Sequence, residues 1–290
     1  MVIVKIWGLL GNQMFEYAMS VHLRKMGYEV KYDITQLNEI SEVLGENKIY
    51  ELFDIPFEVA SNAEILRLSN NGNSIMNRLR RQTGFRKRTH VNESDEWVGN
   101  FNEEILHIPD NRYLEGYWQA EQYFKPYDSE IRDLFKFKEV KDAKLSQIKE
   151  QISNEHNSVA VHIRLGDYLS KEHYAKVGGI CDIEYYQIAC DYIESVVEKP
   201  KYYLFSNEPE KARKFLEGRE YVLVDSNDEK RGWKDMMLMS YCKHNIIANS
   251  SFSWWGAWLN NNDNKIVVMP KKWMNDRNRT GVNVDGWVRI

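Results

Sequence analysis

The chain has 290 residues, of which 43% are hydrophobic and 28% charged, and its formal net charge is −4. This composition is ordinary for a globular protein with a sizeable core, and the slight acidity argues against a nucleic-acid-binding protein. The three cysteines form no CxxC pair, which disfavours a zinc ribbon and fits a reducing compartment. No apolar run is long enough to span a membrane, so we expect a cytoplasmic protein.

The N-terminal region begins with a β-α-β pattern. The apolar stretch 2–7 predicts a strand, the stretch 8–11 predicts a turn, and Asn12 is placed to cap the helix that follows. Apolar residues recur at helical spacing up to Met26, and 28–32 predicts the next strand.

The middle of the chain has fewer clean patterns. We expect short helices and loops over 33–110, a strand over 112–116, and helices over about 120–135 and 140–152. The basic segment 78–90 is typical of a solvated loop. Its alternative interpretation is peripheral contact with the inner membrane face or with a lipid-linked acceptor.

The second half alternates apolar strands with helices. The predicted strands cover 159–163, 201–205, 221–225, 245–249 and 265–269. The predicted helices lie near 182–198, 208–217, 232–242 and 253–260. This alternation predicts a parallel sheet with helices on both faces.

Polar residues gather directly after four of these strands. They are His162 and Arg164, then Ser206, Asn207 and Glu208, then Asp225, then Asn249, Ser250 and Ser251. Because the carboxyl ends of parallel strands meet at one edge of a sheet, these residues are expected to surround one crevice. Loops are polar in any protein, but four such clusters together favour a ligand site over that simpler explanation.

Two features of the crevice suit phosphate. The guanidinium of Arg164 offers a planar fork for phosphate oxygens. The segment 250–253 opens a helix whose free N–H groups and dipole favour an anion. A serine cap before a core helix, with its tryptophans buried, explains the same residues, and both interpretations hold together.

The chain lacks the signatures of several other enzyme classes. It contains no Asp-x-Asp pair, so protein groups are expected to neutralise a leaving diphosphate without a metal. It also has no GxxxxGK[ST] loop, no full GxGxxG and no GxSxG elbow. Asp235, near the start of a helix, fits either a dipole-favoured acid or a carboxylate that binds guanine.

The chain resembles the bacterial α-1,2-fucosyltransferases, glycosyltransferase family 11. The motifs that carry the resemblance occur in family order and span nearly the whole chain: Gly8-Leu-Leu-Gly-Asn-Gln-Met-Phe-Glu-Tyr-Ala18, Glu115-Gly-Tyr-Trp-Gln119, Val161-His-Ile-Arg-Leu-Gly-Asp-Tyr168, Asp235-Met-Met-Leu-Met-Ser240, Ile247-Ala-Asn-Ser-Ser-Phe-Ser-Trp-Trp-Gly-Ala257 and Pro270-Lys-Lys-Trp273.

The resemblance implies an α/β protein of the GT-B kind, with two Rossmann-type domains whose parallel sheets face a cleft. Residues 1–155 would form an acceptor-side domain and 156–290 a GDP-sugar-binding domain. The implied reaction is metal-independent, inverting transfer of fucose from GDP-fucose to the 2-hydroxyl of a galactoside. The acceptor would be an oligosaccharide or a surface glycan such as O-antigen, with a lipid-linked form as one option.

The expected site residues combine this resemblance with the strand-end clusters. Those expected to contact the donor are Gly11, His162, Arg164, Ser206, Asn207, Asp235, Asn249, Ser250, Ser251, Phe252 and Ser253. Those expected to serve the reaction are Arg164, Asn12, Asp167 and Glu16. The resemblance assigns guanine to His162 and Asp235, the β-phosphate to Arg164, and a place near the transferred sugar to Asn12.

The chemistry of the site leaves some alternatives open. Asp167 and Glu16 are candidates for the general base, and a structural role is the alternative for both. Leu165 stands where the family has a second arginine, which removes one positive charge from the donor site. A transferase for another nucleotide sugar and a non-catalytic carbohydrate- or nucleotide-binding protein are the rival functions.

Overall fold

The computed structural model covers residues 1–290 and describes all of them except 72–76, 80–81, 83–86, 94–97, 139–140 and 225–228. The chain divides into two compact units. Unit 1 comprises Met1–Lys136 and Thr280–Val282, and unit 2 comprises Phe137–Arg279 and Asn283–Ile290.

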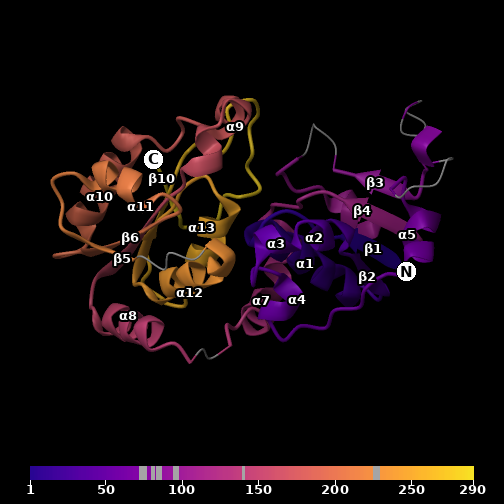
Figure 1. Cartoon of the computed structure of the whole chain (residues 1–290), viewed down its shortest axis with the longest axis horizontal. Helices are drawn as coiled ribbons and strands as arrows, with labels where there is room; N and C mark the ends of the chain where they lie inside the picture. The colour runs from indigo at the N-terminus through magenta and orange to yellow at the C-terminus, as the bar shows by residue number, and fades with distance from the viewer. Residues whose placement is uncertain (72–76, 80–81, 83–86, 94–97, 139–140, 225–228) are drawn as a thin grey trace. The chain divides into compact units, whose positions relative to one another are not determined.

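Among its described residues, unit 1 has a four-stranded parallel sheet in the order β2-β1-β4-β3 (Figure 1). The strands are β1 (Val2–Lys5), β2 (Val30–Asp33), β3 (His90–Asn92) and β4 (Arg112–Glu115). Three of them follow the predicted pattern. The strand β3 was not predicted, because a three-residue strand leaves almost no periodic signal in the sequence.

Helix α1 (Leu10–Lys25) links β1 to β2 and begins before the expected cap. Leu9 is its N-cap, and its carbonyl already accepts hydrogen bonds from the backbone N–H groups of Asn12 and Gln13. The prediction that Asn12 caps this helix is therefore wrong, since Asn12 lies inside the first turn. The helix ends at Lys25, just before Gly27, whose φ of 92° suits a helix stop.

Short helices supply the rest of unit 1, as predicted for 33–110. They are α2 (Thr35–Glu39), α3 (Ser41–Leu44), α4 (Ile49–Leu52), α5 (Asn62–Leu68) and η1 (Glu103–His107). The helix predicted over 120–135 is instead three pieces: η2 (Glu121–Tyr123), η3 (Lys125–Tyr127) and α7 (Asp128–Leu134). Pro126 explains the break, because proline donates no backbone hydrogen bond and clashes with the preceding turn.

The described part of unit 2 contains a six-stranded parallel sheet in the order β10-β9-β8-β5-β6-β7. Its strands are β5 (Ser158–Ile163), β6 (Lys201–Ser206), β7 (Tyr221–Leu223), β8 (His244–Ile246), β9 (Val267–Met269) and β10 (Val288–Arg289). Both faces are covered, with α10 and α11 on one side and α12 and α13 on the other (Figure 1). The alternation seen in the sequence correctly predicts this layered arrangement.

Unit 2 has helices near all five predicted positions, and it also has helices over 166–169, 171–177 and 229–231 that were not predicted. Together they are α8 (Ala143–Asn154), η4 (Gly166–Leu169), α9 (Lys171–Val177), α10 (Ile183–Val196), α11 (Pro209–Ala212), η5 (Arg213–Leu216), η6 (Glu229–Arg231), α12 (Trp233–Tyr241) and α13 (Ser251–Trp258). Asp182 caps α10, since its side chain accepts a hydrogen bond from the N–H of Tyr185 (2.9 Å).

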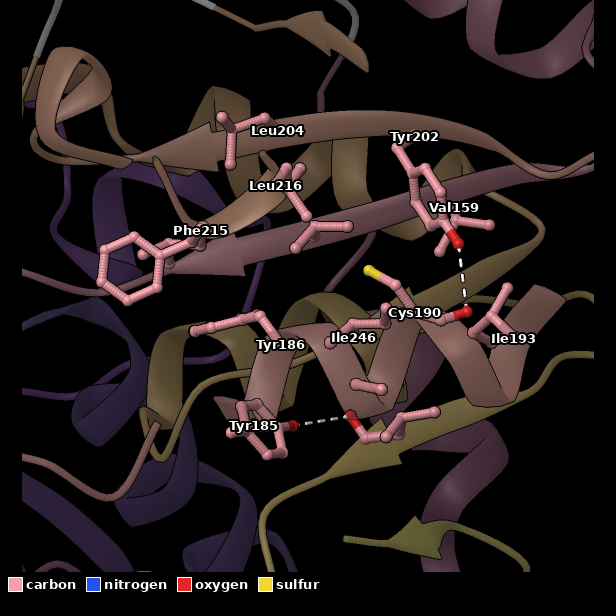
Figure 2. Close-up of a cluster of buried hydrophobic side chains, with 14 of the residues drawn as sticks. Val159, Tyr185, Tyr186, Cys190, Ile193, Tyr202, Leu204, Phe215, Leu216 and Ile246 are labelled. Atoms are coloured by element: carbon pink, nitrogen blue, oxygen red, sulfur yellow. Dashed lines mark hydrogen bonds between the residues drawn. The ribbon is translucent and has the colours of Figure 1, made fainter. Parts of the chain in front are cut away.

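The core on one face of this sheet anchors the strand end that carries the candidate site. Figure 2 shows Tyr185, Tyr186 and Cys190 of α10 among buried residues of the sheet. The Tyr185 hydroxyl donates to the carbonyl of Ile247 (2.7 Å), and the Tyr186 hydroxyl donates to the carbonyl of His162 (2.8 Å). These bonds fix the carboxyl ends of β5 and β8 to the buried face of α10.

The division between the units falls after Lys136, whereas the sequence analysis placed a domain boundary at 155/156. The difference concerns α8, which packs with α12 in unit 2. An ion pair between Asp142 and Lys234 (2.8 Å) ties the start of α8 to α12. No helix among the described residues is long and apolar enough to cross a membrane.

Candidate functional site

The unit 2 sheet reverses its strand order next to β5. From β5 the chain proceeds through β6 to β7, and it then returns to place β8 on the other side of β5. The loops after β5 and β8 therefore run in opposite directions over the sheet. Ligands of open α/β sheets bind at such a switch point, outside the carboxyl ends of the strands.

A pocket of about 340 Å³ lies at this switch point. Arg164 and Leu165 line it from the loop after β5, and Asn249 lines it from the loop after β8. The rest of its wall comes from η4, from α9 and the segment after it, from the start of α10 and from η5: Tyr168, Tyr174, Val177, Gly178, Gly179, Cys181, Asp182, Ile183, Glu184, Lys214 and Phe215.

Tyr168 connects the loop after β5 to the loop after β8. The guanidinium of Arg164 lies 5.8 Å from the ring centroid of Tyr168. The hydroxyl of Tyr168 donates to the carbonyl of Asn249 (3.0 Å). Tyr168 thus links the loop after β5, which carries Arg164, to the loop after β8.

His162 is a buried histidine at the end of β5, with 4% of its surface exposed. Its ring centroid lies 5.3 Å from that of Phe252. Burial, and secondly the positive charge of Arg164, lower the pKa of His162 to about 3. The imidazole is therefore neutral at pH 7, and within the described part of the chain no group hydrogen-bonds its buried Nδ1.

Asn207, directly after β6, holds the loop that carries Arg164, and Ser206, the last residue of β6, holds the loop after its own strand. The Asn207 Oδ1 accepts a hydrogen bond from the N–H of Leu165 (2.9 Å). Gly166 has a φ of 64°, and a Cβ there would lie 2.5 Å from the Asn207 Nδ2, so this close approach requires glycine. Ser206 Oγ accepts from the N–H of Glu208 (3.1 Å). Both side chains bind backbone groups and so position their loops.

Asn249 and the start of α13 are held by several side-chain bonds. Asn249 donates from its Nδ2 to the carbonyls of Val177 and Trp273 (both 3.1 Å). Ser253 is buried, and its hydroxyl donates to the carbonyls of Ala248 and Ser250. The residues that leave part of their surface exposed at this helix start are Ser251 and Phe252.

The tryptophans of α13 have the structural role that the sequence analysis weighed beside the functional one. Trp254, Trp255 and Trp258 are each at most 2% exposed. They contact one another at ring-centroid distances of 5.0 to 6.1 Å. They therefore form core under the helix, and Ser250 is its N-cap.

Of the predicted donor-contact residues in unit 2, Arg164 and Asn249 line this pocket. The described residues of that set that are not part of its lining are His162, Ser206, Asn207, Asp235, Ser250, Ser251, Phe252 and Ser253. Asp235 lies in the first turn of α12, on the other face of the sheet from α10. Asp167 belongs to η4, but its side chain is outside the described part of the structure, as is all of Asp225. Their predicted roles stay predictions.

The remaining predicted residues belong to unit 1 and lie in the first turns of α1. Gly11 is buried, and the Asn12 Oδ1 accepts from the Gln119 Nε2 (2.9 Å). The side chain of Glu16, a candidate for the general base, is fully buried and accepts from the N–H of Trp7 (2.9 Å). Burial raises the pKa of Glu16 well above its ordinary value, although the bond from Trp7 opposes this effect. Burial therefore favours the protonated form of the Glu16 carboxyl group.

A network of polar side chains occupies the unit 1 sheet. Glu115, at the end of β4, lies 2.7 Å from the Lys5 Nζ and 3.0 Å from the His90 Nε2. Burial alone would raise the pKa of Glu115, but the bonds from His90 and Lys5 outweigh it and lower the pKa to about 2. Beside this group, the Tyr113 hydroxyl donates to the Asp33 Oδ2 (2.6 Å).

Sequence reasoning missed the residues that complete the unit 2 pocket. Tyr174, Glu184 and Lys214 come from three separate segments, and none lies directly after a strand. The one signal present in the sequence is the glycine pair at 178–179. Across the described residues, no group of three or more His, Cys, Asp or Glu side chains is placed to hold a metal ion.

The two units, each with a parallel sheet, have the GT-B fold. Among solved structures, the fold is similar to that of the α-1,6-fucosyltransferase NodZ from Bradyrhizobium, which was crystallised with GDP. That match has a TM-score of 0.53 and 15% identity, and it covers 88% of this chain and 90% of the NodZ chain. The family model described as Glycosyl transferase family 11 matches residues 67–290, and the chain belongs to this family.

Three relatives are similar to the chain over different lengths. An α-1,2-colitosyltransferase of Escherichia coli is 30% identical over 299 residues, covering 100% of this chain and 98% of that protein. The E. coli O-antigen biosynthesis glycosyltransferase WbnK is 39% identical over 143 residues, or 49% of this chain. The galactoside α-(1,2)-fucosyltransferase 1 of Homo sapiens is 30% identical over 107 residues. The chain spans only 47% and 29% of the lengths of these last two relatives.

Proposed function

We propose that the protein transfers fucose from GDP-fucose to the 2-hydroxyl of a galactoside in an oligosaccharide or surface glycan. The observation that carries this proposal is the placement of Arg164 in a pocket at the switch point of the unit 2 sheet. Family membership supports glycosyl transfer, and the names of the relatives support fucose or a related sugar. An acceptor linked to a lipid carrier, reached by peripheral membrane contact, belongs to the same proposal. Residues 80–81 and 83–86 of the segment 78–90 assigned to that contact lie outside the described residues.

The proposed mechanism is a single displacement with inversion. The acceptor hydroxyl attacks the anomeric carbon of the sugar, the bond from that carbon to the phosphate oxygen breaks, and GDP leaves. Negative charge builds on the leaving phosphate, where Arg164 and the backbone N–H groups at the start of α13 stabilise it. These groups supply the stabilisation without a metal ion.

The neutral state of His162 supports the assignment of the diphosphate charge to Arg164. A neutral imidazole beside Arg164 leaves the guanidinium as the local cation for a diphosphate. The buried Nδ1 of His162 is an orphaned polar atom, which a ligand group would satisfy. The expected contacts of His162 and Asp235 with guanine are part of this proposal.

The general base is proposed from two candidates with different prospects. Glu16 is buried, and burial raises its pKa and so disfavours the carboxylate that a general base needs, which favours a structural role for it. Asp167 lies in η4, three residues after Arg164, and is the stronger candidate for the general base. The pH–rate profiles of Glu16→Gln and Asp167→Asn test this choice. The acidic limb should disappear only in Asp167→Asn, and unchanged profiles in both variants would eliminate the pair.

Transfer of colitose is the second candidate function. It is favoured by the relative that matches the whole chain, which is named an α-1,2-colitosyltransferase. Fucose and colitose are both 6-deoxy sugars, and colitose lacks a further hydroxyl at C3. A competition between GDP-fucose and GDP-colitose decides between the two donors.

The deciding experiment is a turnover assay with purified protein, each of the two GDP-sugars, a panel of β-galactosides and EDTA. Mass spectrometry and NMR identify the product and its linkage. An α-1,2-linked 6-deoxy sugar formed in EDTA supports donor class, linkage and metal independence together. GDP binding without product from any acceptor would support the non-catalytic alternative, and faster turnover of another nucleotide sugar would replace the proposed donor.

A further inference from the structure

Tyr174 presents one face of its ring beside the pocket. It lies on α9 and is 50% exposed although it is a large aromatic residue. Gly178 packs against the ring so closely that a Cβ at Gly178 would overlap it, and Gly179 lies next to its hydroxyl. The Gly178 N–H donates to the Tyr174 carbonyl (2.9 Å), and the Asn275 Nδ2 donates to the Gly178 carbonyl (2.8 Å). The glycine backbone therefore provides a fixed seat for the ring.

The pocket wall near Tyr174 combines apolar side chains with two charged side chains that form no ion pair within the described part of the chain. Val177, Ile183 and Phe215 line it, and Ile183 remains 42% exposed. Lys214 and Glu184 line it too, and neither makes an ion pair with any residue that the structure describes.

Lys214 has no carboxylate partner among the described residues, whereas two basic residues near it do. On the same segment, Lys211 pairs with Glu208 and Arg213 pairs with Glu210, each at 3.1 Å. Lys214 instead lies 5.6 Å from the ring centroid of Phe215, which lines the pocket. A cation and a carboxylate beside an aromatic face suit the hydroxyls and the apolar face of a sugar.

The size of the pocket restricts which part of a donor it accepts. Small-molecule sites span roughly 300–1,000 Å³. At about 340 Å³ this pocket lies at the lower end, which suits one monosaccharide better than a whole nucleotide sugar. Because the transferred sugar is bonded to the diphosphate, it must lie beside the arginine that binds the phosphate.

We propose that this pocket holds the 6-deoxy sugar of the donor, with Tyr174 as its stacking platform and Arg164 at the phosphate end. The C6 methyl group packs against Val177, Ile183 and Phe215, and the hydroxyls bind Glu184 and Lys214. This inference rests on the proposed function and extends it to the residues that select the sugar.

The test compares the binding of GDP-fucose with that of GDP by calorimetry. Tyr174→Ala is expected to weaken GDP-fucose binding about tenfold while GDP affinity stays within twofold, since GDP carries no sugar. Tyr174→Phe retains the platform and should bind as the wild type does. Tyr241 is also partly exposed (37%) and lies on α12 away from the pocket, so Tyr241→Ala serves as the matched control.

The outcomes separate this inference from the function on which it rests. Equal losses for GDP and GDP-fucose would put the nucleotide in the pocket and overturn the inference while keeping the donor class. No loss for either ligand would also overturn it. A wild-type protein that binds neither ligand would contradict the proposed function itself, and the inference with it.

Two further comparisons test the apolar wall without changing Tyr174. Ile183→Ala should weaken GDP-fucose binding, whereas Ile188→Ala should not. Ile188 is similarly exposed (45%) on the same helix but does not line the pocket. GDP-L-galactose differs from GDP-fucose only by a C6 hydroxyl, and burial of that hydroxyl without a partner should weaken its binding by about tenfold or more. Equal affinity for the two donors would contradict the placement of C6.

Discussion

In the unit 1 sheet, Lys5 and His90 each pair with Glu115, whereas at the carboxyl edge of the unit 2 sheet Arg164 and Lys214 line a pocket. Both sheets are parallel, and both carry charged side chains near their strand ends. In unit 1 the register places Glu115 beside Lys5, so the charges neutralise each other. In unit 2 the strand order reverses beside β5, so the loops after β5 and β8 run in opposite directions and leave a pocket between them. The comparison teaches that strand-end charge marks a ligand site only where the topology keeps the charges apart.

The largest effect is expected at the unit 2 edge. Arg164→Ala should lower turnover by about 10²–10³-fold, because a charged donor to the leaving phosphate is lost. The side chain is only partly buried, so the fold should survive, and circular dichroism checks this. Arg164→Lys keeps the charge without the planar fork and should show an intermediate loss. Wild-type turnover in a folded Arg164→Ala variant would sink the assignment.

The unit 1 edge should respond in stability. Glu115→Gln is expected to cost about 2–3 kcal/mol at pH 7, measured by urea denaturation, because Lys5 and His90 lose their carboxylate. The folded-state pKa of about 2 lies below the ordinary value of 4.5, so this contribution is present above pH 4.5 and disappears as the pH falls towards 2. Glu103→Gln is the control, since that side chain is 75% exposed. A constant difference between wild type and Glu115→Gln down to pH 2 would contradict the network.

Acid should weaken unit 2 before unit 1. The pKa of His162 is lowered from 6.5 to about 3, so the folded state resists its protonation. Stability is full above pH 6.5 and falls as the pH drops towards 3, by roughly 2 kcal/mol at pH 5. His162→Gln should flatten the stability curve between pH 6.5 and 5. If the wild-type curve is already flat in that range, His162 is not buried as described.

The smallest effects concern helix caps. Asp182→Ala removes the cap of α10 and should cost about 1 kcal/mol, and Ser61→Ala should cost about the same at α5 in unit 1. Asp182 also lines the pocket, so only its substitution is expected to change GDP-fucose affinity. Parallel thermal unfolding and calorimetry of the two variants measure both effects, and an equal change of affinity would break the contrast.

Much of the fold could be predicted from the sequence. The strand β5 and the helix α10 have clear apolar patterns and clear boundaries, such as the N-cap Asp182 at the start of α10. Errors arose where one backbone group decided the outcome. The carbonyl of Leu9 starts α1 before Asn12, and Pro126 divides a predicted helix. Periodicity does not register such single events.

The site could be predicted only in part. Arg164 and Asn249 follow strands, so the topology brings them together and the sequence marks them. Tyr174 and Lys214 reach the same pocket through the packing of α9 and η5, which depends on contacts between residues far apart in the chain. The burial of Glu16 follows from the packing of α1 within unit 1, which the local sequence around Glu16 does not reveal.

The most direct test of the account is a calorimetric titration of GDP into three proteins: wild type, Arg164→Ala and Lys5→Met. The account predicts that wild type and Lys5→Met bind GDP with similar affinity. Arg164→Ala should bind at least about tenfold more weakly, because a charge-assisted bond to phosphate is lost. Unchanged affinity in Arg164→Ala, or an equal loss in Lys5→Met, would contradict the claim that the unit 2 edge is where the nucleotide binds.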